Sequence, residues 1–217
     1  ARGYSLYTVF EDDDVNQVIN FISKPSTKIN ARSCDVIEED LKVFEDQHHL
    51  MGSCKAKIQL ALVHQGCTVL AMSFSRSRFE SDHQWELVRY TTGDVAVVGG
   101  AERLFKYFLR NYNPQSIISY SDRRFSKGLV YAKLGFQPVG VTSPNYWYVK
   151  RGGVLRLSRQ KFQKHKLSKL LASFDPTLSE HQNMLNNKYV RVYDCGSQIW
   201  SWKFHQEETA EIIWSKY

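Results

Sequence analysis

A short polar run, SYSDRR at residues 119–124, follows an apolar segment and could carry chemistry. Asp122 could act as a general base or orient a polar ligand. Tyr120 and Tyr131 could supply hydroxyl donors beside it. The same pattern is explained equally well by an ion pair between Asp122 and a neighbouring arginine, combined with a helix cap. The residue types alone leave both interpretations open.

Small residues at 97–101, VVGGA, come between an expected strand and an expected helix. Such residues let backbone N–H groups approach an anionic ligand at a helix N-terminus, and the pyrophosphate of coenzyme A would suit this place. A tight turn that packs the helix closely on the sheet needs the same glycines. The candidate cofactor-binding residues are Val98, Gly99, Gly100 and Ala101.

Two adjacent histidines, His48 and His49, could act as a base or contact a substrate. They could also satisfy terminal carbonyls at a helix end, which is the commoner role. Their spacing to Cys34 and Cys54 matches no zinc template, so we assign no metal. The four cysteines show no C-x-x-C spacing, which is typical of reduced or buried thiols.

These residues need a mixed sheet to position them. The patterning predicts strands at 4–10, 32–37, 58–63, 67–74, 85–90, 116–120 and 146–150, and helices at 15–22, 38–47, 99–110 and 127–134. A hairpin is expected at 64–66. Glu86 and Arg89, three apart on a strand, are expected on opposite faces. The acidic run 11–14 could supply nuclease metal ligands, but a solvated helix start explains it more simply. The order of elements favours an α/β (α+β) fold, a mixed sheet with flanking helices.

The positive charge is concentrated in one segment. The chain of 217 residues has a net charge of +7, and residues 150–174 contain eight basic and no acidic side chains. Apolar residues among them predict a basic amphipathic helix, and residues 189–193 and 198–204 predict a small terminal hairpin. Such a block favours a polyanion as partner, nucleic acid before an acidic protein or membrane surface. The candidate nucleic-acid contacts are Arg123, Arg124, Arg156, Arg159, Lys161, Lys164, Lys166 and Lys169.

No apolar run approaches the roughly 20 residues that a membrane helix needs, and no signal-peptide segment is visible at the N-terminus. We therefore expect neither a membrane protein nor a secreted one, and a cytoplasmic location.

The order of motifs resembles a known superfamily. The chain resembles the acyltransferase-like domain of the Gcn5-related N-acetyltransferase superfamily in five blocks. These blocks are HHLMGS (48–53), WELVRYTT (85–92), VVGGAERLFKYFL (97–109), SIISYSDRRFSKGLVYAKLGF (116–136) and PNYWYV (144–149). The phage Mom-type DNA-modification proteins within it look most similar. The positions that match their motifs are His48, His49, Gly52, Glu86, Arg89, Ser119, Asp122, Gly128 and Tyr131.

The chain as a whole resembles the C-terminal part of phage homing endonucleases of the Hef-like, very-short-patch-repair-like kind. The matching segments are VFEDDD (9–14), Ala31-Arg32-x-Cys34, the basic stretch 159–167 and the end at 179–204. The nuclease motifs that this family places upstream of its F-E-D stretch are not in the sequence. This resemblance implies a nuclease-like remnant and linker over 1–30, an acetyltransferase-like domain over 31–150, and a basic DNA-binding segment with a small terminal module over 151–217.

Three functions follow from these resemblances. The leading expectation is a phage DNA-binding protein that holds double-stranded DNA through the acetyltransferase-like domain and the basic segment. The second is an acyl-CoA-dependent transferase that modifies DNA bases, with acetyl-CoA as cofactor, Asp122 as base, Tyr131 as acid or orienting hydroxyl, and His48 and His49 nearby. The third is a non-catalytic module that binds a host protein through residues 175–217.

Overall fold

The structure, a computed structural model, describes residues 6–23, 25–78 and 82–204. The chain forms two compact units, and each has its own hydrophobic core. Unit 1 contains the described residues up to 13 together with 122–125 and 142–197. Unit 2 contains the described residues of 14–121, 126–141 and 198–204. None of the helices in the described ranges is long and apolar enough to cross a membrane.

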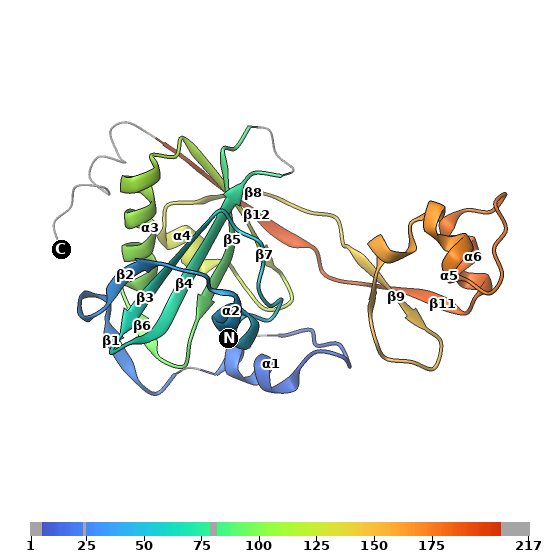
Figure 1. Ribbon diagram of the computed structural model, residues 1–217, viewed down its shortest axis with the longest axis horizontal. Helices are drawn as coiled ribbons and strands as arrows, with labels where there is room; N and C mark the ends of the chain where they lie inside the picture. Colours follow the sequence, from blue (N-terminus) through green and yellow to red (C-terminus); the bar gives the residue numbers. More distant parts are fainter. Residues whose placement is uncertain (1–5, 24, 79–81, 205–217) are drawn as a thin grey trace, which may run out of the picture. The chain divides into compact units, whose positions relative to one another are not determined.

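A mixed sheet forms the centre of unit 2 (Figure 1). In the described part of the chain it has seven strands in the order β2-β3-β4-β5-β7-β12-β8. Strands β2 to β5 pair antiparallel, β5 and β7 pair parallel, and β12 and β8 pair antiparallel. The bounds are β2 Asp35–Glu38, β3 Ile58–His64, β4 Cys67–Arg76, β5 Trp85–Thr92, β7 Ser116–Asp122, β8 Gln137–Val141 and β12 Ser197–Lys203. This confirms the expected α/β class with a mixed sheet.

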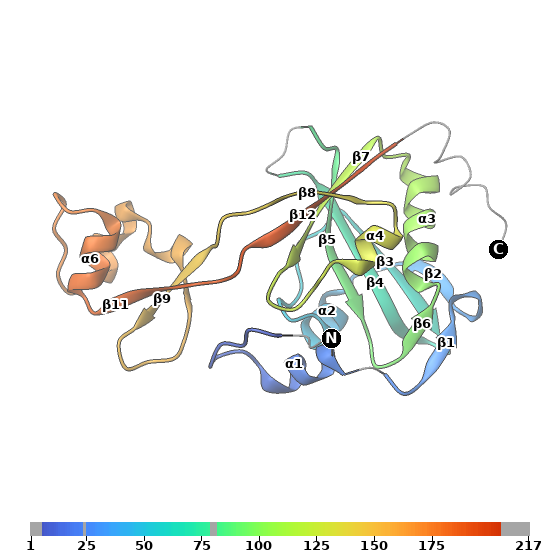
Figure 2. The ribbon, with the colours of Figure 1, turned by 180° about the vertical axis from the view of Figure 1, so that it is seen from behind.

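Two helices cover opposite faces of this sheet (Figures 1 and 2). Helix α3 (Gly100–Tyr112) buries Leu104, Phe105 and Phe108 in the main core, where Phe108 stacks on Phe74. Helix α2 (Lys42–His48) packs on the other face, against the small side chains of Ala61 and Ala71. We call these the α3 face and the α2 face.

The remaining elements of unit 2 are short. They are α1 (Val15–Ile22), η1 (Ala31–Ser33), α4 (Leu129–Lys133) and the parallel pair β1 (Lys28–Asn30) and β6 (Ala96–Val98). Asp14 caps α1 by accepting from the N–H groups of Asn16 and Gln17, as its place before the helix predicts. The hairpin between β3 and β4 is also confirmed: Gln65 and Gly66 both have positive φ, which suits a two-residue turn.

Unit 1 is built on a small antiparallel sheet. In its described residues, β9 (Tyr146–Lys150) lies between β10 (Leu157–Ser158) and β11 (Tyr189–Tyr193). The segment after β10 forms η2 (Arg159–Phe162), η3 (Lys164–Lys166) and α5 (Leu167–Leu170), and α6 (Glu180–Asn186) follows. Tyr148, Phe162, Leu167 and Met184 form the core.

Three sequence-based expectations are wrong. Residues 6–10 form no strand, and the expected residues 4 and 5 lie outside the described part. The segment 150–174 is not one amphipathic helix, because Gly152 turns the chain at positive φ and the helical pieces that follow are short. Strands β11 and β12 do not pair as a hairpin; β11 pairs with β9 and β12 with β8.

Candidate functional site

A bulge in β5 decides which residues share the α2 face. Ser73 pairs with Arg89 whereas Phe74 pairs with Leu87, so Val88 is an extra residue in β5. An extra residue reverses the alternation of side chains beyond it. Glu86, paired with Ser75, and Arg89 therefore lie on the same face. The expectation that they lie on opposite faces is wrong for this reason.

Arg89 is fixed near the middle of the α2 face by backbone carbonyls. Its Nε donates to the Gly52 carbonyl over 2.9 Å, and its Nη1 donates to the Val88 carbonyl over 3.0 Å. Two matched positions of the resemblance, Gly52 and Arg89, are thus in direct contact. These two acceptors are neutral main-chain carbonyls. They orient the guanidinium but do not neutralise its positive charge, as a carboxylate would.

A buried carboxylate on the α2 face was not identified from the sequence. Glu45 of α2 is fully buried. It accepts hydrogen bonds from the Ser73 hydroxyl and, over 3.2 Å, from the Cys54 N–H. Buried polar groups must be hydrogen-bonded, and here one carboxylate ties the helix, the centre of β4 and the loop before β3 together. Glu45 is one of several acidic residues in the expected helix 38–47. This composition predicts a helix exposed to solvent and does not indicate that one of the acids is buried.

The two histidines occupy different places at the end of α2. His48 lies beside Phe44, with Nδ1 3.8 Å from the Asp94 carboxylate. His49 accepts the Met51 N–H at Nδ1 over 3.1 Å, which places its proton on Nε2. Burial, together with the charge of Arg89, lowers the pKa of His49 to about 4. At neutral pH His49 is therefore a hydrogen-bond donor and not a protonated imidazolium.

Cys54 and an ion pair complete the polar groups on this face. Arg78 binds Glu86 with two hydrogen bonds of 3.2 and 3.0 Å. Burial raises the pKa of the Cys54 thiol, and the charges of Arg89 and Arg78 offset only part of the increase. A thiol with a raised pKa is a poor nucleophile at neutral pH. The α2 face thus combines two carboxylates, Glu45 and Glu86, with the guanidinium groups of Arg78 and Arg89. Its Cys54 thiol is not activated.

Tyr131 and Ser119 lie on the α3 face instead. Tyr131 is buried, stacks on Trp200 and hydrogen-bonds with Ser119. Burial raises the pKa of its hydroxyl, and Ser119 and the Arg89 charge offset part of this. Ser119 in turn donates to the Leu87 carbonyl over 2.7 Å. Tyr131 thus stays protonated, and the sheet separates it from the histidines.

The glycines before α3 are explained by the turn itself. Gly99 has φ +76°, a conformation that side chains disfavour. A Cβ on Gly100 would lie 3.0 Å from Leu70 Cδ1 and from Val97. The structural interpretation, a tight turn with close helix–sheet packing, accounts for both positions. Val98 is exposed beside them and Ala101 is nearly buried.

In unit 1, two of the expected phosphate contacts are engaged with carboxylates. Arg124 binds Asp122 over 3.0 Å and Asp13 over 3.1 Å. Arg156 binds Asp12 and Asp13, and both guanidinium groups lie over the Phe10 ring. The structure therefore supports the ion-pair interpretation of the polar run 119–124. Arg124 engages the Asp122 carboxylate, which base catalysis would need to be available.

The rest of the basic segment is exposed. Phe162 and Leu167 enter the core of unit 1, whereas the basic residues around them are exposed, although Arg159 lies over the Tyr146 ring and the Lys166 ammonium donates to the Gln160 carbonyl over 3.0 Å. These exposed side chains are Arg159, Lys161, Lys164, Lys166 and Lys169. Arg123 is exposed as well, although its Nη1 donates to the Cys195 carbonyl over 2.9 Å. Five of the eight expected contacts are thus exposed cations of the segment 159–169, which we call the unit 1 basic surface.

Within the described ranges, no group of three or more histidine, cysteine, aspartate or glutamate side chains is placed to hold a metal ion. The four cysteines are free thiols. Compared with known proteins, the chain matches no protein-family model and no curated protein sequence.

Proposed function

We propose that this protein binds double-stranded DNA through the unit 1 basic surface. The observation that carries the proposal is the way the segment 159–169 is held. Two apolar anchors, Phe162 and Leu167, are 4% and 0% exposed, while the five cations between and beside them are exposed. A segment fixed at both anchors has its backbone already ordered, so little backbone freedom is lost when a polyanion binds.

The physical basis is neutralisation of phosphates. Each lysine or arginine that contacts a phosphate releases condensed counterions from the duplex, and this release drives sequence-independent binding. No acidic side chain occurs between residues 150 and 174 to compete with DNA for these cations. Of the acids in unit 1, Asp12 and Asp13 are paired with Arg156, and Asp175 is held by Thr177 but lies within electrostatic reach of Lys164.

The resemblance to phage homing endonucleases supports the same partner, because the stretch 159–167 matches a basic stretch of that family. On the same ground we propose that the protein acts on phage or host DNA and that unit 2 has an acetyltransferase-like fold. The parallel β5–β7 pair within a mainly antiparallel sheet is compatible with that fold.

The proposal is tested by fluorescence anisotropy with a labelled 20-base-pair duplex. The variant R159Q/K161Q/K164Q/K166Q/K169Q is expected to bind at least tenfold more weakly than the unchanged chain at 100 mM salt. The control K55Q/K57Q/K133Q removes three exposed lysines of unit 2, and the loss of binding free energy per removed charge should be much smaller than in the fivefold variant. Equal affinity of the fivefold variant and the unchanged chain would refute the proposal.

A second candidate function, acyl transfer to DNA bases with acetyl-CoA, is favoured by one observation. Strands β5 and β7 pair over Trp85–Leu87 and Ile117–Ser119, although β5 continues to Thr92 and β7 to Asp122. Open sheets bind ligands at the carboxyl ends of their parallel strands, where such strands separate. Calorimetry with acetyl-CoA tests this candidate function. We expect a dissociation constant below about 1 mM, and the absence of binding heat at about 1 mM acetyl-CoA would contradict the candidate.

A further inference from the structure

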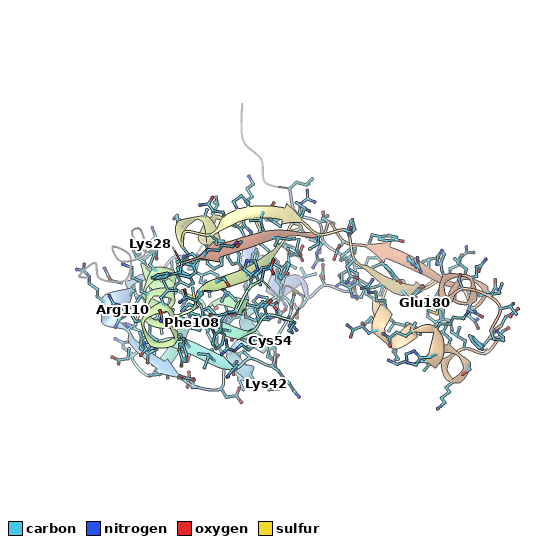
Figure 3. All side chains as sticks on the ribbon, turned by 90° about the horizontal axis from the view of Figure 1, so that it is seen from above. Lys28, Lys42, Cys54, Phe108, Arg110 and Glu180 are labelled. Carbon is cyan, nitrogen blue, oxygen red and sulfur yellow. The ribbon has the colours of Figure 1, made fainter. Side chains whose placement is uncertain are left out.

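A second basic site lies in unit 2, on the outer side of α3. A groove of about 540 Å³ is lined by Arg32, Val36, Arg103, Lys106, Tyr107 and Arg110. Four of these six side chains are cations and none is a carboxylate. In Figure 3, Phe108 points from α3 toward the sheet, whereas Arg110 lies on the outer side of the same helix.

The helix places its cations in a row. Residues spaced three or four apart lie on one face of a helix. In α3 this spacing joins Arg103, Lys106, Tyr107 and Arg110. Seven residues separate the first and last, a distance of about 10 Å along the helix axis. The row is long enough to meet more than one phosphate of a nucleic-acid strand, whose charges recur about every 3.4 Å along the duplex axis.

The other wall of the groove is fixed to this row. The Arg103 guanidinium donates to the carbonyl of Ala31, at the start of η1, and Arg32 follows as an exposed side chain. Arg103 is therefore a positioning residue that holds η1 against α3. Glu38 of β2, on the same side of the sheet, accepts the Tyr112 hydroxyl over 2.6 Å.

We propose that this groove, the α3 groove, is a second binding site for the phosphate backbone of duplex DNA. The groove suits a polyanion rather than an uncharged metabolite, because four of its six lining side chains are cations and none is a carboxylate. Arginine forks bind phosphate oxygens with two parallel hydrogen bonds, which a continuous backbone can offer at several points. The inference rests on the proposed function for its choice of polymer.

The test measures the salt dependence of duplex binding by anisotropy between 50 and 300 mM NaCl. The variant R32Q/K106Q/R110Q should lower the magnitude of the slope of log K against log[salt] by roughly 2 to 3, since each phosphate contact contributes about 0.9. Arg103 is left unchanged because it holds the groove together. The control K55Q/K57Q/K133Q removes the same charge from unit 2 outside the groove and should lower the slope by less than about 1.

A charge-preserving variant separates binding from structure. R32K/R110K keeps both charges and should retain most of the slope, and the single variant R32Q on the exposed wall should lose about 1. An unchanged slope in the groove variant, or an equal loss in the control or in R32K/R110K, overturns the inference. Displacement of DNA by micromolar inorganic triphosphate, with loss of that competition in the groove variant, would also overturn it and indicate a small polyphosphate ligand. The fivefold unit 1 variant tests the proposed function separately, since it leaves the α3 groove intact.

Discussion

The carboxylate of Asp13 is paired with the guanidinium of Arg156, which lies 143 residues later in the chain. Burial raises the pKa of Asp13, but the Phe10 N–H, Arg156 and Arg124 outweigh it, and the pKa is lowered overall. Asp13 therefore stabilises unit 1 above the pKa of the unfolded carboxyl, near 4, and this contribution is lost as pH falls through the lower folded pKa. The pair joins the N-terminal segment to the start of the basic segment.

Replacement of Arg156 should therefore damage stability more than DNA contact. Arg156→Gln leaves Asp12 and Asp13 partly buried without their main partner, which we expect to cost roughly 3 kcal/mol of unfolding free energy. Arg159→Gln, at an exposed position, should cost less than about 0.5 kcal/mol but weaken DNA binding. Urea denaturation of both variants measures the difference, and equal stabilities would contradict the role assigned to the ion pair.

His49 should make unit 2 sensitive to mild acid. Its pKa is lowered to about 4 in the folded chain, mainly by burial. Between about pH 6.5 and 4 the unfolded chain binds a proton that the folded chain does not, so stability falls as pH falls in this window. The loss should approach about 3 kcal/mol. Urea titrations at intervals from pH 7.5 to 4.5 should show this slope in the unchanged chain and a shallower one in His49→Gln. Identical pH profiles would show that His49 is not buried as described.

Gly128 packs directly against an indole ring. It has φ +69°, and a Cβ there would lie 2.1 Å from Trp200 Cζ2. Gly128→Ala should cost roughly 3 kcal/mol or more, from the strained backbone and from displacement of the ring that stacks on Tyr131. Gly66 provides the control, because it has φ +80° with nothing within 4 Å. Gly66→Ala should cost only about 1–2 kcal/mol. Thermal unfolding compares the two, and equal losses would argue against the Trp200 contact.

The sequence predicted local elements well where apolar runs are long. The hairpin at 64–66, the helix after Gly99 and the buried strand at 116–120 follow from periodicity and turn residues, and the structure has all three. The sequence allows two interpretations of the turn at Gly99 and Gly100, and the close approach of Leu70 to Gly100 supports tight packing of the helix on the sheet.

Features that depend on pairing could not be read from the sequence. The bulge at Val88 places Arg89 on the same face of the sheet as Glu86. No residue type in β5 predicts a bulge at this position. Strands β11 and β12 are adjacent in sequence but pair with β9 and β8, because those distant strands offer partners that local patterning does not reveal. The basic segment breaks its helical pattern for a related reason: the core of unit 1 takes Phe162 and Leu167, five residues apart, and the cations face solvent.

The most direct test of the account is the salt dependence of duplex binding by the unit 1 basic surface. We predict that log K for a 20-base-pair duplex falls linearly with log[salt], and that replacing the five exposed cations Arg159, Lys161, Lys164, Lys166 and Lys169 with glutamine lowers the magnitude of the slope by about 4 to 5. A slope in the fivefold variant equal to that of the unchanged chain, or binding by the unchanged chain that does not depend on salt, would contradict the central claim.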